Sequence, residues 1–336
     1  MSASPHPRVV IAASSVRHVA EGLRRLGGID VVERPDLADT ASEQQLVEGL
    51  AGAWAVVAGS EVYSRAAFEQ FDALRAIFRF GVGYDAVDVA AATDYDVAVV
   101  TTPGANAEAV ADMALMLMLA CIRGLPTLES AVRTGSWRPR TPSRDLALAT
   151  VAIVGLGAIG RAVARRLHGF GCELLAVEPA LDRDFCAELG IEALSLDDAL
   201  ARADVVTLHA ALTPATRHLL GARELALLSP HAVVVNTSRG GLIDEAALVD
   251  ALTDGRLAAA GLDVFEKEPL NPGEALLALS NVIVTGHVSS FTELATRLTS
   301  DAVVDHVAAL LAGIRPEGCL NSPPWISNGA PVANGE

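Results

Sequence analysis

An apolar stretch at residues 151–154 runs directly into three closely spaced glycines, Gly155, Gly157 and Gly160. A helical pattern follows, and a second apolar stretch then ends at the acidic residue Glu178. A strand, a glycine-rich turn, a helix and a second strand in this order are typical of a parallel sheet. The first glycine permits a tight turn, the second lets a ligand approach the backbone, and the third lets the helix pack closely on the strand. This context predicts a dinucleotide-binding unit in which the helix N-terminus faces a pyrophosphate.

The position of the glycine motif predicts how the chain is divided. The motif begins near the middle of 336 residues, so about 100 residues must form something else first, and a chain of this length exceeds one ordinary core. Apolar stretches alternate with helical patterns on both sides of the motif, which is typical of α/β proteins with doubly wound parallel sheets. We expect strands at residues 8–13, 54–58, 76–80, 97–100, 151–154, 174–177, 205–209, 232–235, 258–264 and 282–285.

Two long helical patterns indicate where the chain crosses between domains. Residues 106–122 carry methionine and leucine on nearly all sides, as a helix buried between two domains requires, and residues 293–311 form the second pattern. We therefore expect one domain from residues 1–102 and 290–325, and an inserted dinucleotide-binding domain from residues 103–289. Residues 326–336 are expected to form a flexible tail.

Composition excludes several classes of function. The net charge of −16 argues against nucleic acid or an anionic membrane as partner, because either partner requires a basic face. No apolar run approaches the ~18–20 residues that span a bilayer, and no signal-peptide pattern is found. The four cysteines show no paired spacing. We expect a cytoplasmic protein with free thiols and no metal site.

Polar residues follow the later predicted strands where each strand ends. His209 and Ala210 follow the third of these strands, residues 236–239 the fourth, Asp263 the fifth and His287 the last. Ligands bind at the carboxyl ends of strands in an open parallel sheet, so these residues are predicted to share one edge. Histidine suits proton transfer near neutral pH, and a neighbouring carboxylate raises the pKa of a histidine and fixes its tautomer. An arginine fork fits a carboxylate, so the set favours hydride transfer to a 2-keto acid.

Five blocks in this order resemble the D-isomer-specific 2-hydroxyacid dehydrogenase family: residues 155–161, 208–218, 235–241, 261–269 and 285–290. The resemblance implies a Rossmann NAD-binding domain inserted into a flavodoxin-like substrate domain. It also implies that Arg239 binds the substrate carboxylate or carbonyl group. His287 is then the acid/base residue, and Glu268 tunes it.

The resemblance also implies two sets of binding residues. The cofactor set is Gly155, Gly157, Ala158, Ile159, Gly160, Glu178, His209, Ala210, Thr237, Ser238, Arg239, Asp263, His287, Ser289 and Ser290. The substrate set is Arg79, Val82, Gly83, Asn106, Arg239 and His287, in which backbone amides near Val82 and Gly83 bind the substrate carboxylate.

Three further expectations concern the cofactor and the assembly. Glu178 is expected to bind the ribose hydroxyls and to repel a 2′-phosphate, which favours NAD over NADP. Arg183 lies nearby in the sequence, so some use of NADP stays open. The resemblance implies a homodimer formed through the cofactor domains, to which the segment 125–142 is expected to contribute.

Several alternatives stay open. Within the family, Glu268 argues against formate dehydrogenases, which pair the histidine with glutamine, and the lack of any lysine before Lys267 argues against phosphite dehydrogenases. A phosphoglycerate dehydrogenase or a hydroxypyruvate reductase fits, and the identity of the 2-hydroxy acid is not indicated. The alternative from another class is an NADH-sensing dimeric regulator, because the family's co-repressors retain residues similar to Arg239, Glu268 and His287.

Overall fold

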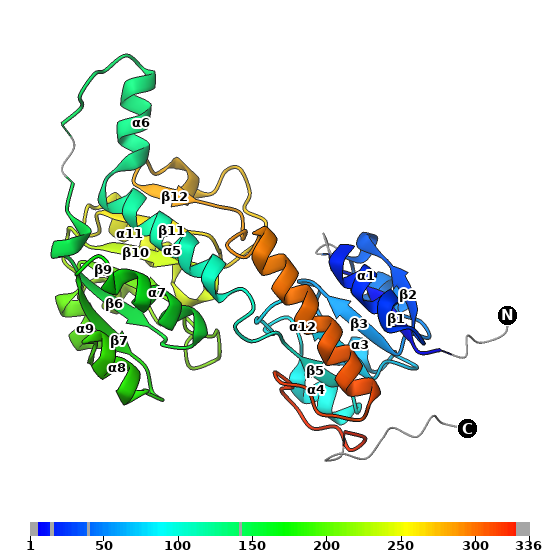
Figure 1. Cartoon of the computed structure of the whole chain (residues 1–336). Helices are drawn as coiled ribbons and strands as arrows, with labels where there is room; N and C mark the ends of the chain where they lie inside the picture. The colour runs from blue at the N-terminus through cyan, green and yellow to red at the C-terminus, as the bar shows by residue number, and fades with distance from the viewer. Residues whose placement is uncertain (1–5, 14–16, 39–40, 141–142, 327–336) are drawn as a thin grey trace. The chain divides into compact units, whose positions relative to one another are not determined.

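The structure is a computed structural model that describes residues 6–13, 17–38, 41–140 and 143–326 (Figure 1). The chain divides into two compact units. Unit one comprises Met1–Asn106 and Glu293–Glu336, and unit two comprises Ala107–Thr292. Unit two is therefore inserted into unit one along the chain. Apart from Ile326, which is buried, the expected tail at 326–336 lies outside the described residues.

Unit one is built on a five-stranded sheet in which every pairing is parallel. Its order is β2-β1-β3-β4-β5, which is the flavodoxin-like order. The strands are β1 (Arg8–Ile11), β2 (Asp30–Glu33), β3 (Ala55–Ala58), β4 (Ala76–Arg79) and β5 (Ala98–Val100). The three inner strands β1, β3 and β4 are almost wholly buried, as a parallel sheet covered on both faces requires.

Helices cover both faces of this sheet. They are α1 (Arg17–Leu26), α2 (Glu43–Gly49), α3 (Arg65–Phe68), α4 (Val89–Asp94) and α12 (Glu293–Leu311), with a 3₁₀ turn η1 (Pro35–Leu37). Helix α12 forms at the expected residues and packs beside α1, although some 270 residues separate them in sequence (Figure 1). A Cβ atom at Gly22 of α1 would lie 2.6 Å from Val304 Cγ2, so the glycine permits this close approach.

Unit two is built on a seven-stranded parallel sheet of order β12-β11-β10-β9-β6-β7-β8. The strands are β6 (Thr150–Val154), β7 (Glu173–Val177), β8 (Glu192–Ala193), β9 (Val205–Leu208), β10 (Val233–Asn236), β11 (Ala259–Leu262) and β12 (Val282–Val284). The chain moves outward from β6 to β8 and then returns to the other side of β6. The reversal between β6 and β9 is the switch point at which doubly wound sheets bind ligands.

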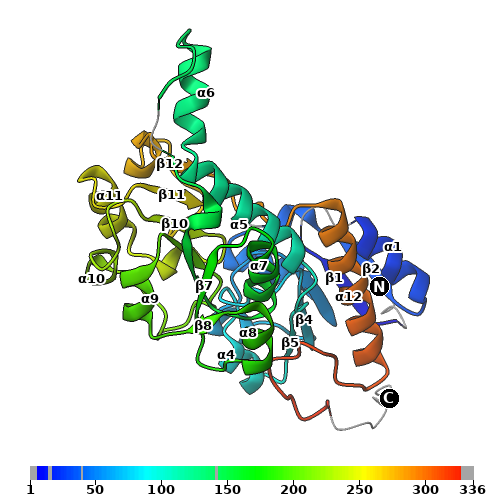
Figure 2. The ribbon, with the colours of Figure 1, turned by 60° about the vertical axis from the view of Figure 1, so that its left-hand side comes forward.

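Helices α5 and α7 contribute to the hydrophobic cluster on one face of this sheet, and α9, α10 and α11 contribute to the cluster on the other. The helices of unit two are α5 (Ala107–Ile122), α6 (Leu125–Arg133), α7 (Ala158–His168), α8 (Arg183–Leu189), α9 (Leu196–Arg202), α10 (Ala222–Leu225) and α11 (Glu245–Thr253). Short 3₁₀ turns lie at η2 (Leu146–Leu148), η3 (Gly240–Leu242) and η4 (Ala275–Ala278). Helix α6 projects away from the rest of unit two in both overall views (Figures 1 and 2).

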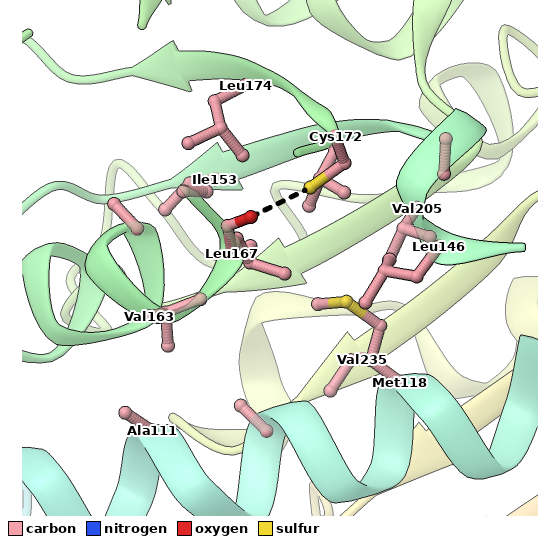
Figure 3. Packing of buried hydrophobic residues seen from close by; sticks show 14 of the residues in the cluster. Ala111, Met118, Leu146, Ile153, Val163, Leu167, Cys172, Leu174, Val205 and Val235 are labelled. Atoms are coloured by element: carbon pink, nitrogen blue, oxygen red, sulfur yellow. Dashed lines mark hydrogen bonds between the residues drawn. The ribbon is translucent and has the colours of Figure 1, made fainter. Parts of the chain in front are cut away.

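Helix α5 is buried along most of its length, which agrees with its apolar residues on nearly all sides. Figure 3 shows Met118 of α5 directed toward Val235 of β10, with Ala111 on the same helix. At Gly261 of β11 a Cβ atom would lie 2.9 Å from Leu117 Cβ, so a glycine in the strand lets α5 approach the sheet.

All four cysteines are free, and burial raises the pKa of Cys121 to about 12, which leaves that thiol inert.

Two strands are missing from the sequence-based expectation. Both β2 and β8 are short edge strands that contain acidic residues; β2 is partly exposed, and both residues of β8 are exposed. An edge strand is buried on fewer sides, so it needs no continuous apolar run and its sequence signal is weak.

Within the described ranges, no single helix is both long and apolar enough to cross a membrane. Helices α5 and α6 pass that test only as a pair, and the pair is bent by 63°.

Candidate active site

The glycine turn after β6 shows why three glycines are needed at this spacing. Gly155 has φ +93°, and a Cβ atom there would lie 2.6 Å from the backbone nitrogen of Ala210. A Cβ atom at Gly160 would lie 2.1 Å from the carbonyl oxygen of Gly155. A Cβ atom at Gly157 would meet no described atom within 4 Å. Protein packing thus explains the first and third glycines, whereas the second leaves open space that a ligand can occupy.

The N-terminus of α7 provides a site for an anion beside this open space. Gly157 is the N-cap residue and offers no side chain to the first-turn amides, so the structure records no side-chain cap there. The helix continues for 11 residues to His168. Unsatisfied amides and the helix dipole favour a negative charge at such an end. The turn therefore fits the pyrophosphate of a dinucleotide.

Glu178 lies at the end of β7 and reaches back across the glycine turn. One carboxylate oxygen accepts a hydrogen bond from the amide of Leu156 at 2.9 Å, and the other accepts from the amide of Ala180 at 2.9 Å. Arg161 of α7 also supports this turn, because its Nε donates to the carbonyl oxygen of Leu156 at 3.1 Å. Its guanidinium also pairs with Asp182 at 2.7 Å. The acid at the end of the second strand is thereby fixed beside the turn.

His209 follows β9 on the other side of the switch point. Its Nε2 atom is hydrogen-bonded to the Thr207 hydroxyl at 2.9 Å, and its backbone amide donates to the carbonyl oxygen of Val154 at 2.7 Å. Burial lowers the pKa of His209 to about 3, so this imidazole is neutral near neutral pH. In the described part of the chain, the buried Nδ1 atom of His209 and the buried hydroxyl of Thr237 have no hydrogen-bond partner. Both atoms are available to a bound ligand.

The turn after β10 directs Arg239. The side chain of Asn236 closes this turn, since its Nδ2 donates to the Arg239 carbonyl at 2.8 Å and its Oδ1 accepts from the Ser238 amide at 3.0 Å. Ser238 donates its hydroxyl proton to the carbonyl oxygen of Ala210 at 2.6 Å. The turns that follow β9 and β10 are thereby joined. Gly240 comes next, and a Cβ atom there would lie 1.8 Å from the carbonyl carbon of Phe265, so only glycine fits.

Asp263 is a fully buried anchor at the end of β11. Its carboxylate accepts hydrogen bonds from the amides of Val288 and Ser289, at 3.0 and 2.9 Å, from the Thr285 hydroxyl at 2.5 Å and from the Ser289 hydroxyl. Its carbonyl oxygen accepts from the amide of His287 at 2.7 Å. A buried carboxylate requires such partners. Asp263 therefore fixes the loop after β12 that carries His287.

His287 and Glu268 form the central pair of the site. The Nδ1 atom of His287 lies 2.7 Å from Oε2 of Glu268, while Oε1 of Glu268 accepts from the Phe265 amide at 2.9 Å. Burial raises the pKa of Glu268, but the hydrogen bond and charge of His287 and the Phe265 amide outweigh burial, so the net pKa is lowered. The carboxylate is therefore ionised and accepts a hydrogen bond from Nδ1–H of His287. His287 has φ +56°, a conformation that is strained for a residue other than glycine and that tends to occur at functional sites.

The fold brings the predicted residues of unit two to one edge of its sheet. Each of them lies at the carboxyl end of β6, β7, β9, β10, β11 or β12, in the loop that follows, or in the first turn of the helix after β6. Ala158 and Ile159 lie in the first turn of α7, and Ser289 and Ser290 lie in the loop after β12. Their individual contacts with a cofactor stay predictions. The edge that they share is a finding.

The predicted substrate residues Arg79, Val82, Gly83 and Asn106 belong to unit one. Arg79 ends β4 and is 8% exposed, and its Nε donates to the carbonyl oxygen of Gly83 at 2.9 Å. The buried Oδ1 atom of Asn106 has no hydrogen-bond partner among the described residues. The guanidinium of Arg79 thus supports the loop at 81–83, and whether these four residues bind substrate stays a prediction.

Sequence reasoning placed Asn236 at this edge without a role, and it did not single out Thr285 or Gly240, although all three shape the edge. Asn236 closes the turn before Arg239, Thr285 donates to Asp263, and Gly240 admits the Phe265 carbonyl. Asn236 did carry a signal, because a small amide directly after an apolar strand commonly closes a turn. The other two depend on contacts between segments far apart in sequence, which no local pattern shows.

Comparison with known proteins agrees with this geometry. Residues 115–289 match the sequence model of the "D-isomer specific 2-hydroxyacid dehydrogenase, NAD binding domain". This match covers just over half of the chain and includes the glycine turn and the histidine. The chain belongs to the D-isomer-specific 2-hydroxyacid dehydrogenase family.

Relatives within the family differ in activity. A D-3-phosphoglycerate dehydrogenase from Methanocaldococcus jannaschii is 36% identical over 88% of this chain and 57% of its own length. A glyoxylate reductase from Korarchaeum cryptofilum is 38% identical over 76% of this chain and 78% of its own length. The chain thus spans little more than half of the first of these relatives.

A solved structure shows that the likeness extends over both units. An NADPH-dependent glyoxylate/hydroxypyruvate reductase from Sinorhizobium meliloti, in complex with NADP and malonate, has a TM-score of 0.83 and 32% identity. The similarity covers 95% of this chain and 98% of that one. The α/β fold with two parallel sheets is therefore the fold of the family.

Proposed function

We propose that this protein interconverts a 2-keto acid and the corresponding D-2-hydroxy acid, using a nicotinamide dinucleotide. The observation that carries the proposal is the His287–Glu268 pair. Nδ1 of His287 is hydrogen-bonded to the Glu268 carboxylate at 2.7 Å. Nε2 of His287 has no hydrogen-bond partner within the described parts of the chain. A histidine fixed through one nitrogen keeps the other for proton transfer. Family membership and the glycine turn support the choice of cofactor class.

The residues have distinct roles in the proposed reaction. A bound nicotinamide dinucleotide would supply the hydride for C2 of the keto acid, or accept it in the reverse direction. His287 donates the Nε2 proton to the carbonyl oxygen, which gives the hydroxyl group of the product. Glu268 accepts from Nδ1–H, which fixes the tautomer and stabilises the imidazolium. Arg239 presents its planar fork to the carbonyl and carboxylate oxygens of the substrate.

Glu178 supports NAD as the preferred cofactor. The carboxylate of Glu178 stands beside the glycine turn, where it can accept hydrogen bonds from ribose hydroxyls and repel a 2′-phosphate. Arg183 opens α8 a few residues later and could attract a 2′-phosphate. We expect NADH to give the higher kcat/KM, and initial rates with NADH and NADPH check this.

For the substrate, we propose a small 2-keto acid of the glyoxylate and hydroxypyruvate class, as in the reductases to which the chain is similar. A phosphorylated keto acid is the second candidate, because other relatives are D-3-phosphoglycerate dehydrogenases. The backbone amides of Val82 and Gly83 are proposed to bind the substrate carboxylate. Substitution of Arg79, which holds the Gly83 carbonyl, should then raise KM for the keto acid.

We also propose a homodimer formed through unit two. No residue of α6 is buried, and Leu125, Val132 and the nearby Trp137 are 55%, 48% and 77% exposed. A cavity of about 340 Å³ lies at the base of α6, and apolar side chains such as Ile122 and Ile283 line part of it. In an isologous dimer, α6 and Trp137 of each copy would pack into the cavity of the other copy. Sedimentation should give a dimer, and Trp137→Ser should weaken it.

The test of the proposed function is NADH oxidation across a panel of 2-keto acids, with His287→Ala as the paired variant. We expect turnover of at least one small keto acid by the wild type and a large loss in the variant. If NADH binds tightly but no keto acid is reduced, the enzyme proposal fails. The NADH-sensing regulator then becomes the better account.

A further inference from the structure

The peptide between Phe265 and Glu266 lies against the residues that follow Arg239. A Cβ atom at Gly240 would come within 1.8 Å of the Phe265 carbonyl carbon and 2.2 Å of the Glu266 nitrogen. The two backbone segments are therefore in direct contact. A shift of the 265–266 peptide must move the turn that carries Arg239, since close-packed segments do not deform independently.

The same peptide is held by a carboxylate that the proposed reaction does not use. The amide of Glu266 donates to Oε1 of Glu245 at 2.5 Å, and Glu245 is the first residue of α11. The side chain of Glu266 in turn lies 2.6 Å from Nε2 of His218. This segment is thus anchored twice, through its backbone by Glu245 and through its side chain by His218.

The same segment supports the central pair. The amide of Phe265 donates to Oε1 of Glu268, and Oε2 of Glu268 contacts Nδ1 of His287. Residues 265–268 therefore link Glu245 to His287 through three hydrogen bonds and the short backbone segment between them. Only one residue separates the Glu266 amide from Glu268, so the anchor acts at short range.

We propose that Glu245 is a positioning residue for the reaction, acting through the 265–266 peptide on Glu268 and His287, with His218 as a second anchor. This inference rests on the proposed function. Glu245 touches neither substrate nor the reacting atoms in this account. Its contribution is to hold the Glu268 carboxylate where the histidine requires it.

The charges around Glu245 show which of its properties matters. Burial raises the pKa of Glu245, and the neighbouring carboxylates of Glu266, Glu274 and Glu268 raise it further, while the Glu266 amide opposes them. A negative charge at this position is therefore disfavoured. What the segment needs is the hydrogen-bond acceptor, and a neutral amide oxygen can supply it. The stability linked to this raised pKa is fully present below the unfolded value of about 4.3 and is lost as pH rises through the folded value.

The experiment compares Glu245→Ala, Glu245→Gln and a control, Asp197→Asn. Asp197 also lies in the first turn of a helix, α9, and forms an exposed ion pair with Arg223, far from residues 265–268 in sequence. We expect Glu245→Ala to lower kcat about tenfold while the Kd for NADH changes less than about twofold. Glu245→Gln should retain kcat within about twofold, and Asp197→Asn should match the wild type.

A readout that needs no turnover keeps the two proposals separate. The Nδ1 proton of His287 should give a downfield proton NMR signal, assigned by its loss in His287→Gln. We expect this signal to weaken or shift in Glu245→Ala and to be retained in Glu245→Gln. An unchanged signal and an unchanged kcat in Glu245→Ala would overturn the inference.

If the wild type reduces no keto acid but the signal still shifts in Glu245→Ala, the proposed function fails and the positioning inference holds. If Glu245→Ala does not fold, His218→Gln provides the second variant. His218 is 41% exposed at its side chain, so its replacement is tolerated more easily. A smaller fall in kcat, with the same change of the proton signal, is then expected. A wild-type signal and kcat in His218→Gln would count against the inference.

Discussion

Both ends of the strands in unit two carry a histidine beside a carboxylate. At the carboxyl ends, His287 contacts Glu268 at 2.7 Å, and at the amino ends, His231 contacts Asp204 at 2.9 Å. The two pairs have the same chemical groups and nearly the same separation. A histidine–carboxylate contact alone therefore does not identify an active site.

The surroundings of the two pairs differ. Asp204 is 17% exposed at its side chain and also accepts from Arg144 at 2.6 Å and from the amide of Thr150 at 2.9 Å. The Asp204 carboxylate thus has three hydrogen-bond partners, and His231 is bound to it through Nε2. His287 contributes through Nδ1, so its Nε2 stays available. Each histidine thus keeps one ring nitrogen for another partner, and what distinguishes the proposed site is Arg239 and the glycine turn at the same edge.

The largest expected difference between the two pairs is in turnover. His287→Gln removes the proton donor and should lower kcat by about 10²–10⁴-fold. His231→Gln changes the other pair and should leave kcat within about twofold. Steady-state rates of keto-acid reduction by both variants check this. An equal loss of kcat in the two variants would contradict the assignment of His287, and not His231, as the proton donor.

The second effect concerns the pH profile. Glu268→Gln removes the charge that favours the imidazolium, so kcat should fall about 10–100-fold and the alkaline limb of the reduction profile should move to lower pH. Asp204→Asn should leave that limb unchanged. The measurement is kcat/KM for reduction between pH 5 and 10. A profile unaltered by Glu268→Gln would contradict the assigned role.

The third effect is on stability, and it is expected at the amino-end pair, which the first two predictions leave without an effect on turnover. Burial raises the pKa of Asp204, but the Thr150 amide, His231 and Arg144 outweigh burial, so the net pKa is lowered. A lowered carboxyl pKa contributes stability above the unfolded value of about 3.9, and this stability is lost as pH falls through the folded value. Asp204→Asn should cost about 1–3 kcal/mol at pH 7 and progressively less below about pH 4. Urea unfolding at several pH values checks this, and a cost that does not vary with pH would contradict it.

The smallest effect concerns Arg144, whose side chain is 47% exposed. Arg144→Gln removes an exposed partner from a carboxylate that keeps two others. The loss of unfolding free energy should be less than about 1 kcal/mol and should shrink further in 1 M salt. A loss as large as that of Asp204→Asn would show that the guanidinium, and not the Thr150 amide, holds the amino-end pair.

Local patterns in the sequence predicted most of this arrangement. The buried strands were visible as apolar runs, and the residues after them were correctly assigned to one edge, because parallel strands end together. The edge strands β2 and β8 were missed, since partial exposure removes the apolar signal. The roles of Gly240 and Glu245 were also invisible, because each depends on a contact with residues 265–266 that only the folded chain creates.

The most direct test of the central claim follows the hydride itself. NADH that carries deuterium at C4 is incubated with the wild type, His231→Gln or His287→Gln and a small 2-keto acid, and the product is analysed by mass spectrometry and NMR. We predict one deuterium at C2 of a D-2-hydroxy acid for the wild type and for His231→Gln, and almost none for His287→Gln. If none of the keto acids tested yields a deuterated product although NADH binds, or if both histidine variants fail equally, the carboxyl-end pair is not the active site of a dehydrogenase.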